Sequence, residues 1–207
     1  MPTVDREYVR SSRWRDLRLT AVMLCIGLTP AWLLPNWLAL PWLLVGLILG
    51  VPALFYSWRY APWVPTPDSE FARIIEHLAL ESHQSFCDLG AGDGRMLVRV
   101  HAATGANCIG IEVSPAQYLL ARLRLAISGK PGTAVVFKDL YKADLSGFDA
   151  LYVWGTEYWV GTPEFAEHME RALTPGTRLI SYHYRIRERE PDHIDWGGLR
   201  PIYVYVF

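Results

Sequence analysis

The chain has 207 residues, of which 51% are hydrophobic, with 20 lysines and arginines against 21 aspartates and glutamates. This balance excludes a protein that is basic throughout, as many nucleic-acid-binding proteins are, and the hydrophobic content excludes a disordered chain. The length suits one domain of about 150 residues and a further segment. Charge is unevenly spread: residues 19–58 contain no Asp, Glu, Lys, Arg or His, whereas residues 60–207 hold 14 basic and 18 acidic residues.

The apolar run 19–58 is typical of a membrane segment, because about 18 consecutive apolar residues are enough for a transmembrane helix. One helix of that length would measure about 60 Å, twice the hydrocarbon thickness of a bilayer. The turn-forming pair Pro35-Asn36 lies near the middle of the run. We therefore expect an apolar transmembrane helical hairpin with arms at 19–34 and 37–58. The alternative is a hydrophobic hairpin buried in a soluble oligomer, and how far the first arm crosses stays open.

Charge also sets the expected orientation of this hairpin. Five arginines precede it, Arg59 follows it, and its turn is uncharged. The positive-inside rule then places both ends in the cytoplasm, which predicts a bacterial or archaeal cytoplasmic membrane protein. The expected organisation is an Arg-rich N-terminus at 1–18, the hairpin at 19–58, a linker at 59–67 and a globular domain at 68–207.

Helical and strand patterns alternate after residue 61, which predicts an α/β fold: three Rossmann-like α/β/α layers around a mostly parallel sheet. A first helix is expected after Thr66, with Thr66 as its N-cap and Pro67 as its first residue. Further helices are expected at 95–103, 115–128 and 163–173. Strands are expected at 85–89, 107–112, 134–138, 148–154, 178–182 and 202–207.

The three cysteines, Cys25, Cys87 and Cys108, have neither disulfide nor zinc-ligand spacing. They resemble small buried hydrophobic residues in a reducing compartment. No metal site is expected.

The segment 88–94, Asp-Leu-Gly-Ala-Gly-Asp-Gly, follows a predicted strand and opens a helix, so its glycines let a ligand approach the backbone. Its spacing is Gly-x-Gly-x-Gly, which departs from the dinucleotide-binding pattern Gly-x-Gly-x-x-Gly. Asp88 stands directly before the turn. A carboxylate there repels a pyrophosphate but holds the ammonium of an amino-acid group, directly or through water.

Two further acids follow strands at the same edge of the predicted sheet. Glu112 can accept the hydroxyls of a ribose, and Asp139 can accept from the exocyclic amine of an adenine. S-adenosylmethionine combines an amino acid, a ribose, an adenine and a sulfonium charge, so these acids fit this one cofactor from end to end. The alternative is a structural glycine turn with unrelated surface acids. The predicted cofactor-binding residues are Asp88, Gly90, Ala91, Gly92, Asp93, Glu112, Val113, Asp139 and Leu140.

From about residue 65 to the end, the chain resembles the class I, seven-β-strand S-adenosylmethionine-dependent methyltransferases. More narrowly, it resembles the membrane-anchored protein-lysine methyltransferases that act on the mitochondrial ATP synthase c subunit and adenine nucleotide translocase, with their prokaryotic relatives. That resemblance implies a lysine acceptor in a membrane protein. It rests on the segments 62–66 (Pro-Trp-Val-Pro-Thr), 88–94, 110–112 (Gly-Ile-Glu), 138–141 (Lys-Asp-Leu-Tyr) and 191–193 (Pro-Asp-His).

The methyl acceptor is expected just after the fourth strand, at the carboxyl edge where open α/β sheets bind ligands. Trp154 and Tyr158 would form the acceptor channel by stacking and cation–π contact. Glu157 would orient the lysine ammonium or take its proton, since free lysine, with a pKa of about 10.4, is mostly charged. The alternative places Trp154 in the core and Tyr158 in a packed helix.

Three functions remain open from the sequence. The first is methylation of a membrane-protein lysine, the second is methylation of a lipid or quinone at the membrane, and the third is a non-catalytic S-adenosylmethionine-binding assembly protein. Nucleic acid is not an expected partner, because residues 60–207 are net acidic and no Asn-Pro-Pro-Tyr-type motif follows the fourth strand.

Overall fold

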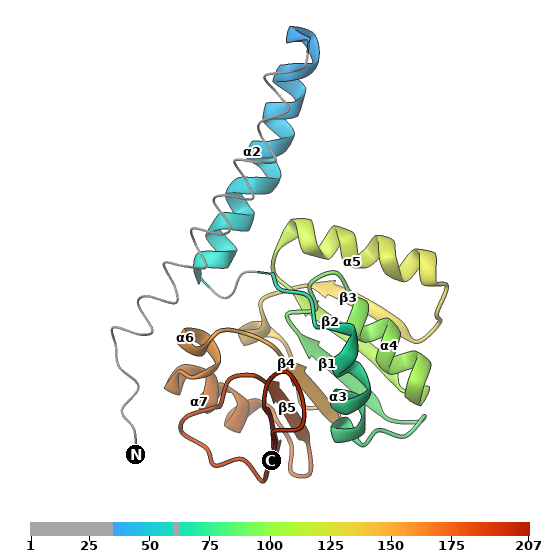
Figure 1. Cartoon of the computed structure of the whole chain (residues 1–207), viewed down its shortest axis with the longest axis vertical. Coiled ribbons are helices and arrows are strands. Elements are labelled where there is room, and N and C mark those ends of the chain that lie inside the picture. The colour runs from blue at the N-terminus through green and yellow to red at the C-terminus, as the bar shows by residue number, and fades with distance from the viewer. Residues whose placement is uncertain (1–34, 60–62) are drawn as a thin grey trace. The chain divides into compact units, whose positions relative to one another are not determined.

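The computed structural model describes residues 35–59 and 63–207, and the chain divides into two compact units (Figure 1). The smaller unit contains the helix α2, Asn36–Arg59. The larger unit, Val64–Val113 with Gln117–Phe207, contains the whole sheet.

The sheet has seven strands in the order β3-β2-β1-β4-β5-β7-β6. The first five strands in the chain pair in parallel, whereas β7 lies antiparallel to both β5 and β6. This confirms the predicted mostly parallel sheet. The strands are β1 (Ser85–Leu89), β2 (Asn107–Glu112), β3 (Thr133–Phe137), β4 (Ala150–Val153), β5 (Arg178–Tyr182), β6 (His193–Asp195) and β7 (Ile202–Val206).

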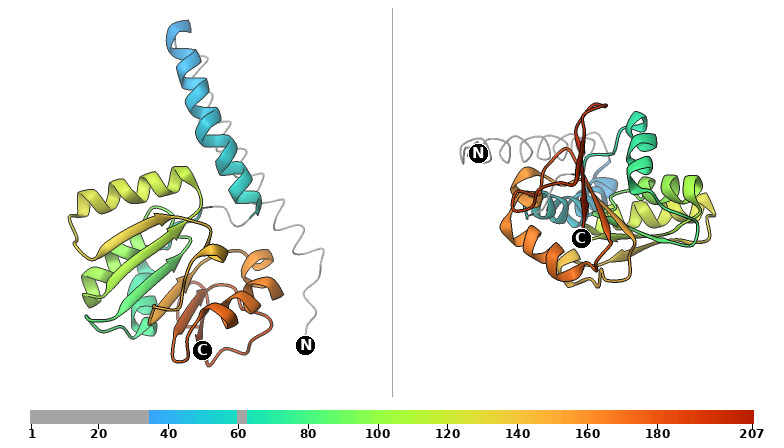
Figure 2. Two further views of the ribbon diagram at one scale, coloured as in Figure 1. Left: turned by 180° about the vertical axis from the view of Figure 1, so that it is seen from behind. Right: turned by 90° about the horizontal axis from the view of Figure 1, so that it is seen from below.

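Helices cover both faces of the sheet, as the three-layer prediction requires. The right-handed crossovers β1-α4-β2 and β2-α5-β3 bring α4 and α5 to one face, which α3 shares. Figure 2 shows α3 and α7 on opposite sides of the sheet. The helices of this unit are α3 (Phe71–Leu78), α4 (Arg95–Thr104), α5 (Pro115–Ser128, of which the unit holds the part from Gln117 on), α6 (Glu157–Val160) and α7 (Pro163–Ala172), with short 3₁₀ turns η2 (Asp68–Glu70) and η3 (Leu140–Lys142).

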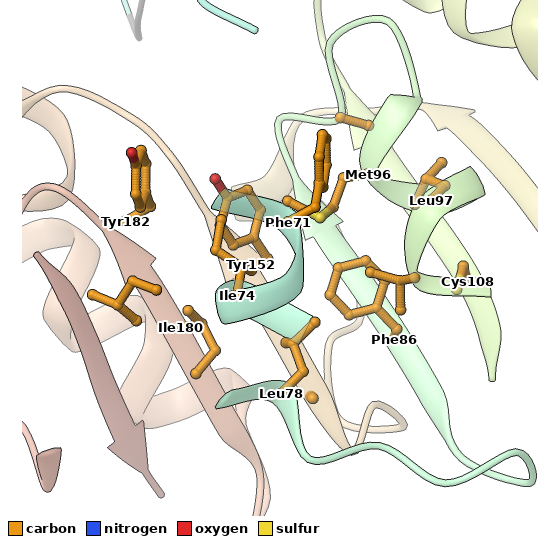
Figure 3. Packing of buried hydrophobic residues seen from close by; sticks show 14 of the residues in the cluster. Phe71, Ile74, Leu78, Phe86, Met96, Leu97, Cys108, Tyr152, Ile180 and Tyr182 are labelled. Carbon is orange, nitrogen blue, oxygen red and sulfur yellow. The ribbon is translucent and has the colours of Figure 1, made fainter. Parts of the chain in front are cut away.

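The main core lies between the sheet and the helices α3 and α4 (Figure 3). Phe86 of β1, Tyr152 of β4 and Ile180 of β5 are buried there and share one face, because side chains alternate along a strand. The same alternation puts Asp88 on the face of Phe86, two residues nearer the carboxyl end of β1. The core therefore fixes where the first candidate site residue lies.

The predicted N-cap at Thr66 is wrong. Thr66 is buried, and its hydroxyl hydrogen-bonds the Tyr152 hydroxyl at 3.1 Å. The turn η2 is instead preceded by Pro67, which offers no side-chain cap, and α3 begins only at Phe71. The Thr66 hydroxyl therefore binds Tyr152, 86 residues further along the chain, and does not cap the helix that follows it.

The predicted transmembrane hairpin is not supported. Its first arm, residues 19–34, lies outside the described residues, as do the N-terminal arginines and Cys25. Its second arm coincides with α2, which begins directly after Pro35 and has 24 residues. Across residues 35–59 and 63–207, no helix combines the length and the apolar character needed to cross a membrane.

Gly110 of β2 lets the loop after β1 pack closely, and its substitution tests this packing. A Cβ at Gly110 would lie 2.5 Å from Ala91 Cβ and 2.9 Å from Leu97 Cδ1. We expect Gly110→Ala to lower the free energy of unfolding by about 1–3 kcal/mol through overpacking. Gly147→Ala is the control, because nothing lies within 4 Å of a Cβ there. Urea unfolding followed by tryptophan fluorescence compares the two, and equal stability would contradict the packing argument.

Candidate functional site

The loop between β1 and α4 is held against the end of β2 by backbone hydrogen bonds. The amides of Gly90 and Ala91 both donate to the Ile111 carbonyl, at 2.9 and 3.0 Å. The amide of Gly92 donates to Glu112 Oε2 at 2.7 Å. Gly90 and Gly92 have φ of 95° and 55°, in the left-handed region that favours glycine. The predicted cofactor loop and Glu112 are therefore brought together.

Asp88 lies at the carboxyl end of β1 and is only 3% exposed. Across the part of the chain that the structure describes, no hydrogen bond or ion pair reaches its carboxylate. Burial, with the nearby carboxylates of Glu112 and Asp93, raises the pKa of Asp88 well above its ordinary value. A buried acid in this state favours a cationic ligand, because a cation would offset both the desolvation and the repulsion.

Asp93 is also buried, but two guanidinium groups already bind it. Arg95 Nη2 lies 2.8 Å and Arg124 Nη2 2.7 Å from Asp93 Oδ2, and Arg124 Nε donates to the Asp93 carbonyl at 2.9 Å. Burial opposes ionisation of Asp93, but these hydrogen bonds and charges outweigh it and lower its pKa. The carboxylate of Asp93 thus ties the loop to α4 and α5.

The remaining predicted cofactor residues follow β2 and β3 at the same edge. Glu112 is buried and Val113 half-buried directly after it. Asp139 is half-buried and caps η3, where its Oδ1 accepts from the Tyr141 amide at 3.1 Å. Leu140, the first residue of this turn, is buried. The adjacent parallel strands β1, β2 and β3 therefore carry Asp88, Glu112 and Asp139 at neighbouring carboxyl ends.

The segment after β4 reaches back to the glycine loop through Trp159. A Cβ on Gly90 would lie 4.0 Å from the Trp159 ring, whose Nε1 donates to the Tyr141 hydroxyl at 3.2 Å. Gly155 makes room for this ring, since a Cβ there would come within 2.2 Å of it. Trp159 thus connects the loops that follow β1, β3 and β4.

The three predicted acceptor residues do not share one environment. Trp154 is half-buried against the core and packs edge-on to Tyr182, with ring centroids 5.0 Å apart. Glu157 opens α6, and its Oε1 lies 2.9 Å from Arg187 Nη2. Tyr158 is half-buried in the same short helix. Trp154 therefore contacts the core, as the alternative expected, and the ion pair of Glu157 is a feature that local sequence did not reveal.

Sequence reasoning missed Tyr182, the aromatic partner of Trp154. Its ring is buried, and burial together with the nearby Glu70 carboxylate raises its pKa to about 12. Tyr152 and Tyr182 point their hydroxyls the same way, towards the carboxyl ends of the parallel strands (Figure 3). The sequence did offer one indication that Tyr182 lies at this site. Side chains alternate along a strand, so Ile180 and Tyr182 of β5 lie on the same face.

A second missed cluster joins η2 to the loop between β6 and β7. Arg73 pairs with Glu70 and donates to the Asp195 carbonyl at 3.3 Å and the Arg200 carbonyl at 2.5 Å. The Leu199 amide donates to Glu70 Oε1 at 3.2 Å. Because β7 starts opposite the end of β5, this cluster holds the loop at the carboxyl edge, beside Tyr182.

The site as a whole suits an elongated ligand with a positive charge near β1. Asp88 offers a buried carboxylate, the glycine loop exposes backbone without Cβ atoms, and Glu112 and Asp139 follow in strand order. Of the described residues, none form a group of three or more His, Cys, Asp or Glu suited to hold a metal ion. The buried Asp88, the glycine loop, Glu112 and Asp139 fit S-adenosylmethionine by their order along the edge of the sheet.

Comparisons with known proteins agree with this fit. The chain is 27% identical over 155 residues to a protein-lysine N-methyltransferase of Saccharolobus islandicus, covering 71% of this chain and 94% of the relative. It is 25% identical to a tRNA U34 carboxymethyltransferase of Saccharophagus degradans, covering 55% of this chain but 36% of that protein. Among solved structures, an RNA methyltransferase of Salinibacter ruber in complex with S-adenosyl-L-homocysteine aligns with a TM-score of 0.65 and 25% identity, over 69% of this chain and 93% of that one.

The family comparison covers the whole cofactor side of the site. The model of the ANTKMT methyltransferase domain matches residues 88–193, from the acid at the end of β1 to the start of β6. This is just over half of the chain. S-adenosylmethionine is accordingly the cofactor. The chain belongs to the ANTKMT methyltransferase domain family, within the class I S-adenosylmethionine-dependent methyltransferases.

Proposed function

We propose that this S-adenosylmethionine-dependent methyltransferase methylates a lysine side chain of a membrane protein. The observation that carries the proposal is the likeness to a protein-lysine N-methyltransferase, which extends over nearly all of that relative. The aromatic pair Trp154–Tyr182 supports it, because a lysine stem packs on aromatic faces and its ammonium is attracted to them.

On the cofactor side, the proposed roles follow the order of the strands. Asp88 would hold the ammonium end, Glu112 the ribose hydroxyls and Asp139 the adenine amine. Gly90, Ala91 and Gly92 would line the ligand with backbone, and Asp93 would keep that loop in place through its arginines. Val113 and Leu140 would give the apolar walls. When bound, the cofactor supplies an activated methyl group on a sulfonium.

On the acceptor side, this chain must align an amine and remove water from it. Trp154 and Tyr158 would form the walls, with Tyr182 behind Trp154. Desolvation beside these rings favours the neutral amine, which is the form that accepts a methyl group. Glu157 would orient the amine at the start of α6, and Arg187 would fix the direction of its carboxylate.

The apolar segment 19–58 is proposed to associate with the membrane. In α2 the side chains of Trp37, Leu40 and Ile48 are 74, 63 and 67% exposed, which is costly in water for a helix with so many apolar residues. The arginines before and after the segment favour the cytoplasmic face of a bacterial or archaeal membrane. Such attachment would raise the effective concentration of a membrane-protein substrate.

The acceptor is tested by methyl transfer from labelled S-adenosylmethionine to membranes of a strain lacking the gene. We expect label in a protein band that maps to lysine, and less label with the Asp88→Asn enzyme at a cofactor concentration below saturation. Label in the organic phase would replace lysine by a lipid or quinone. Cofactor binding without label in either phase would favour a non-catalytic binding protein.

The raised pKa of Asp88 predicts that this residue costs stability in the cofactor-free protein. A carboxyl group whose folded-state pKa is raised destabilises the fold increasingly as pH rises from its unfolded pKa to its folded pKa. Asp88→Asn should therefore raise the melting temperature at pH 8 and leave it unchanged near pH 3. It should also weaken cofactor binding about tenfold or more, because a hydrogen bond to a charged group contributes about 1.5–3 kcal/mol.

Asp149 provides the matched control for this prediction. Hydrogen bonds from Ser85 lower the pKa of Asp149, so its ionised form stabilises the fold above its unfolded pKa. Asp149→Asn should then lower the melting temperature at pH 8. If Asp88→Asn behaves in the same way, the unfavourable burial of Asp88 is refuted.

The role of Glu157 is separated from its ion pair by comparing two variants. Glu157→Gln and Arg187→Gln both break the contact between these side chains. If Glu157 orients the amine, Glu157→Gln should lower kcat about tenfold or more with unchanged cofactor affinity, whereas Arg187→Gln should change kcat about twofold at most. Equal losses in both variants would assign the pair a purely structural role.

A further inference from the structure

The helix α5 carries an apolar face that points away from the core. Leu119, Leu120, Leu123 and Ile127 are 57, 48, 58 and 77% exposed. At about 100° per residue these four side chains share one face of the helix, roughly 100° wide. The helix has 14 residues, and Ala121 is its one buried residue. The outer face of a helix on a globular domain is normally polar, whereas the outer face of α5 is apolar.

The orientation of α5 is fixed by contacts on its inner side. Ala121 packs against Gly94, where a Cβ would come within 3.2 Å of the Ala121 Cβ. Leu125 packs against the main core, and Arg124 binds Asp93. Turning the helix to bury its outer leucines would break all three contacts. The apolar face is therefore a stable surface of the catalytic unit.

Positive charge accompanies this face. Residues 113–138 contain four basic and no acidic residues, whereas the rest of residues 60–207 contains ten basic and eighteen acidic. One of the four, Arg124, is paired with Asp93 on the inner side of the helix, which leaves Arg122, Lys130 and Lys138. Arg122 and Lys130 are exposed on and just after the helix. Phe137, at the end of the edge strand β3, is 53% exposed and packs against Tyr118 of α5 at 5.4 Å between ring centroids. Figure 1 shows α5 beside β3 at one end of the unit.

We propose that the outer face of α5 binds the surface of an anionic lipid bilayer. A helix with apolar side chains on one face and basic residues at its flanks inserts at the boundary between headgroups and acyl chains. A second copy of the chain is a poorer partner, because two such faces would bring basic flanks together without any acid between them. Membrane binding through α5 does not depend on which molecule accepts the methyl group.

Binding through α5 would also place the cofactor side of the site at the bilayer. The helix begins at Pro115, three residues after Glu112, and Leu119 lies about one turn further on. A membrane contact at α5 would thus orient the carboxyl edge of the sheet independently of the N-terminal segment.

The test reads the local environment of α5 in the full-length protein. An environment-sensitive NBD fluorophore is attached at Leu123→Cys in a Cys25→Ser background. Burial raises the pKa of Cys87 and Cys108, so they stay unreactive. The same label at Glu167→Cys, on the exposed side of α7, is the control. Vesicles of phosphatidylcholine are compared with and without phosphatidylglycerol.

We expect a blue shift and a severalfold rise in emission at position 123 with anionic vesicles, reduced by high salt, and no change at position 167. Water-like emission at position 123 with both kinds of vesicle would overturn the proposal. A blue shift without vesicles would also overturn it. If that shift does not depend on protein concentration, another part of the same chain covers the face of α5. If it grows with protein concentration, a second copy of the chain covers it. None of these fluorescence results depends on methyl transfer, which is measured in a separate assay.

Discussion

The packing of the glycine loop against the end of β2 is the contact on which the cofactor side of this protein depends. Two loop amides share the Ile111 carbonyl, and the Gly92 amide binds the Glu112 carboxylate. The loop can pack this closely because Gly110 has no side chain that would clash with Ala91. One consequence is electrostatic: Asp88, Asp93 and Glu112 are gathered in a small buried volume, where like charges raise the cost of ionisation.

Arginines offset the cost of ionising Asp93 but not that of ionising Asp88. Asp93 is neutralised by Arg95 and Arg124, which lock the loop to two helices. Asp88 receives no such partner within the described residues. A site that leaves one buried carboxylate uncompensated is less stable when empty and gains more from a cationic ligand. With Asp88 as the proposed binding group, one motif would provide both a scaffold, through Asp93, and a contact to the cofactor.

Much of the fold was predictable because its determinants are local. The bounds of β1, β2 and β5 agree with the pattern of apolar residues, and Thr162 caps α7 as its Thr-Pro-Glu sequence indicates. The three acids after successive strands were predictable too, because parallel strands end at one edge. What failed depends on distant partners. Thr66 binds Tyr152 and not a helix end, and β6, only three residues long, exists because β7 pairs with it.

The pKa of Asp88 with and without cofactor tests most directly whether this buried carboxylate meets the cation of the cofactor. The carboxyl ¹³C shift, assigned by comparison with Asp88→Asn, is followed through a pH titration by NMR. We expect a pKa well above the ordinary 3.8 in the cofactor-free protein and a marked fall when S-adenosylmethionine is added. An ordinary pKa that the cofactor leaves unchanged would contradict this expectation, because Asp88 would then be neither strained by burial nor in contact with the cation.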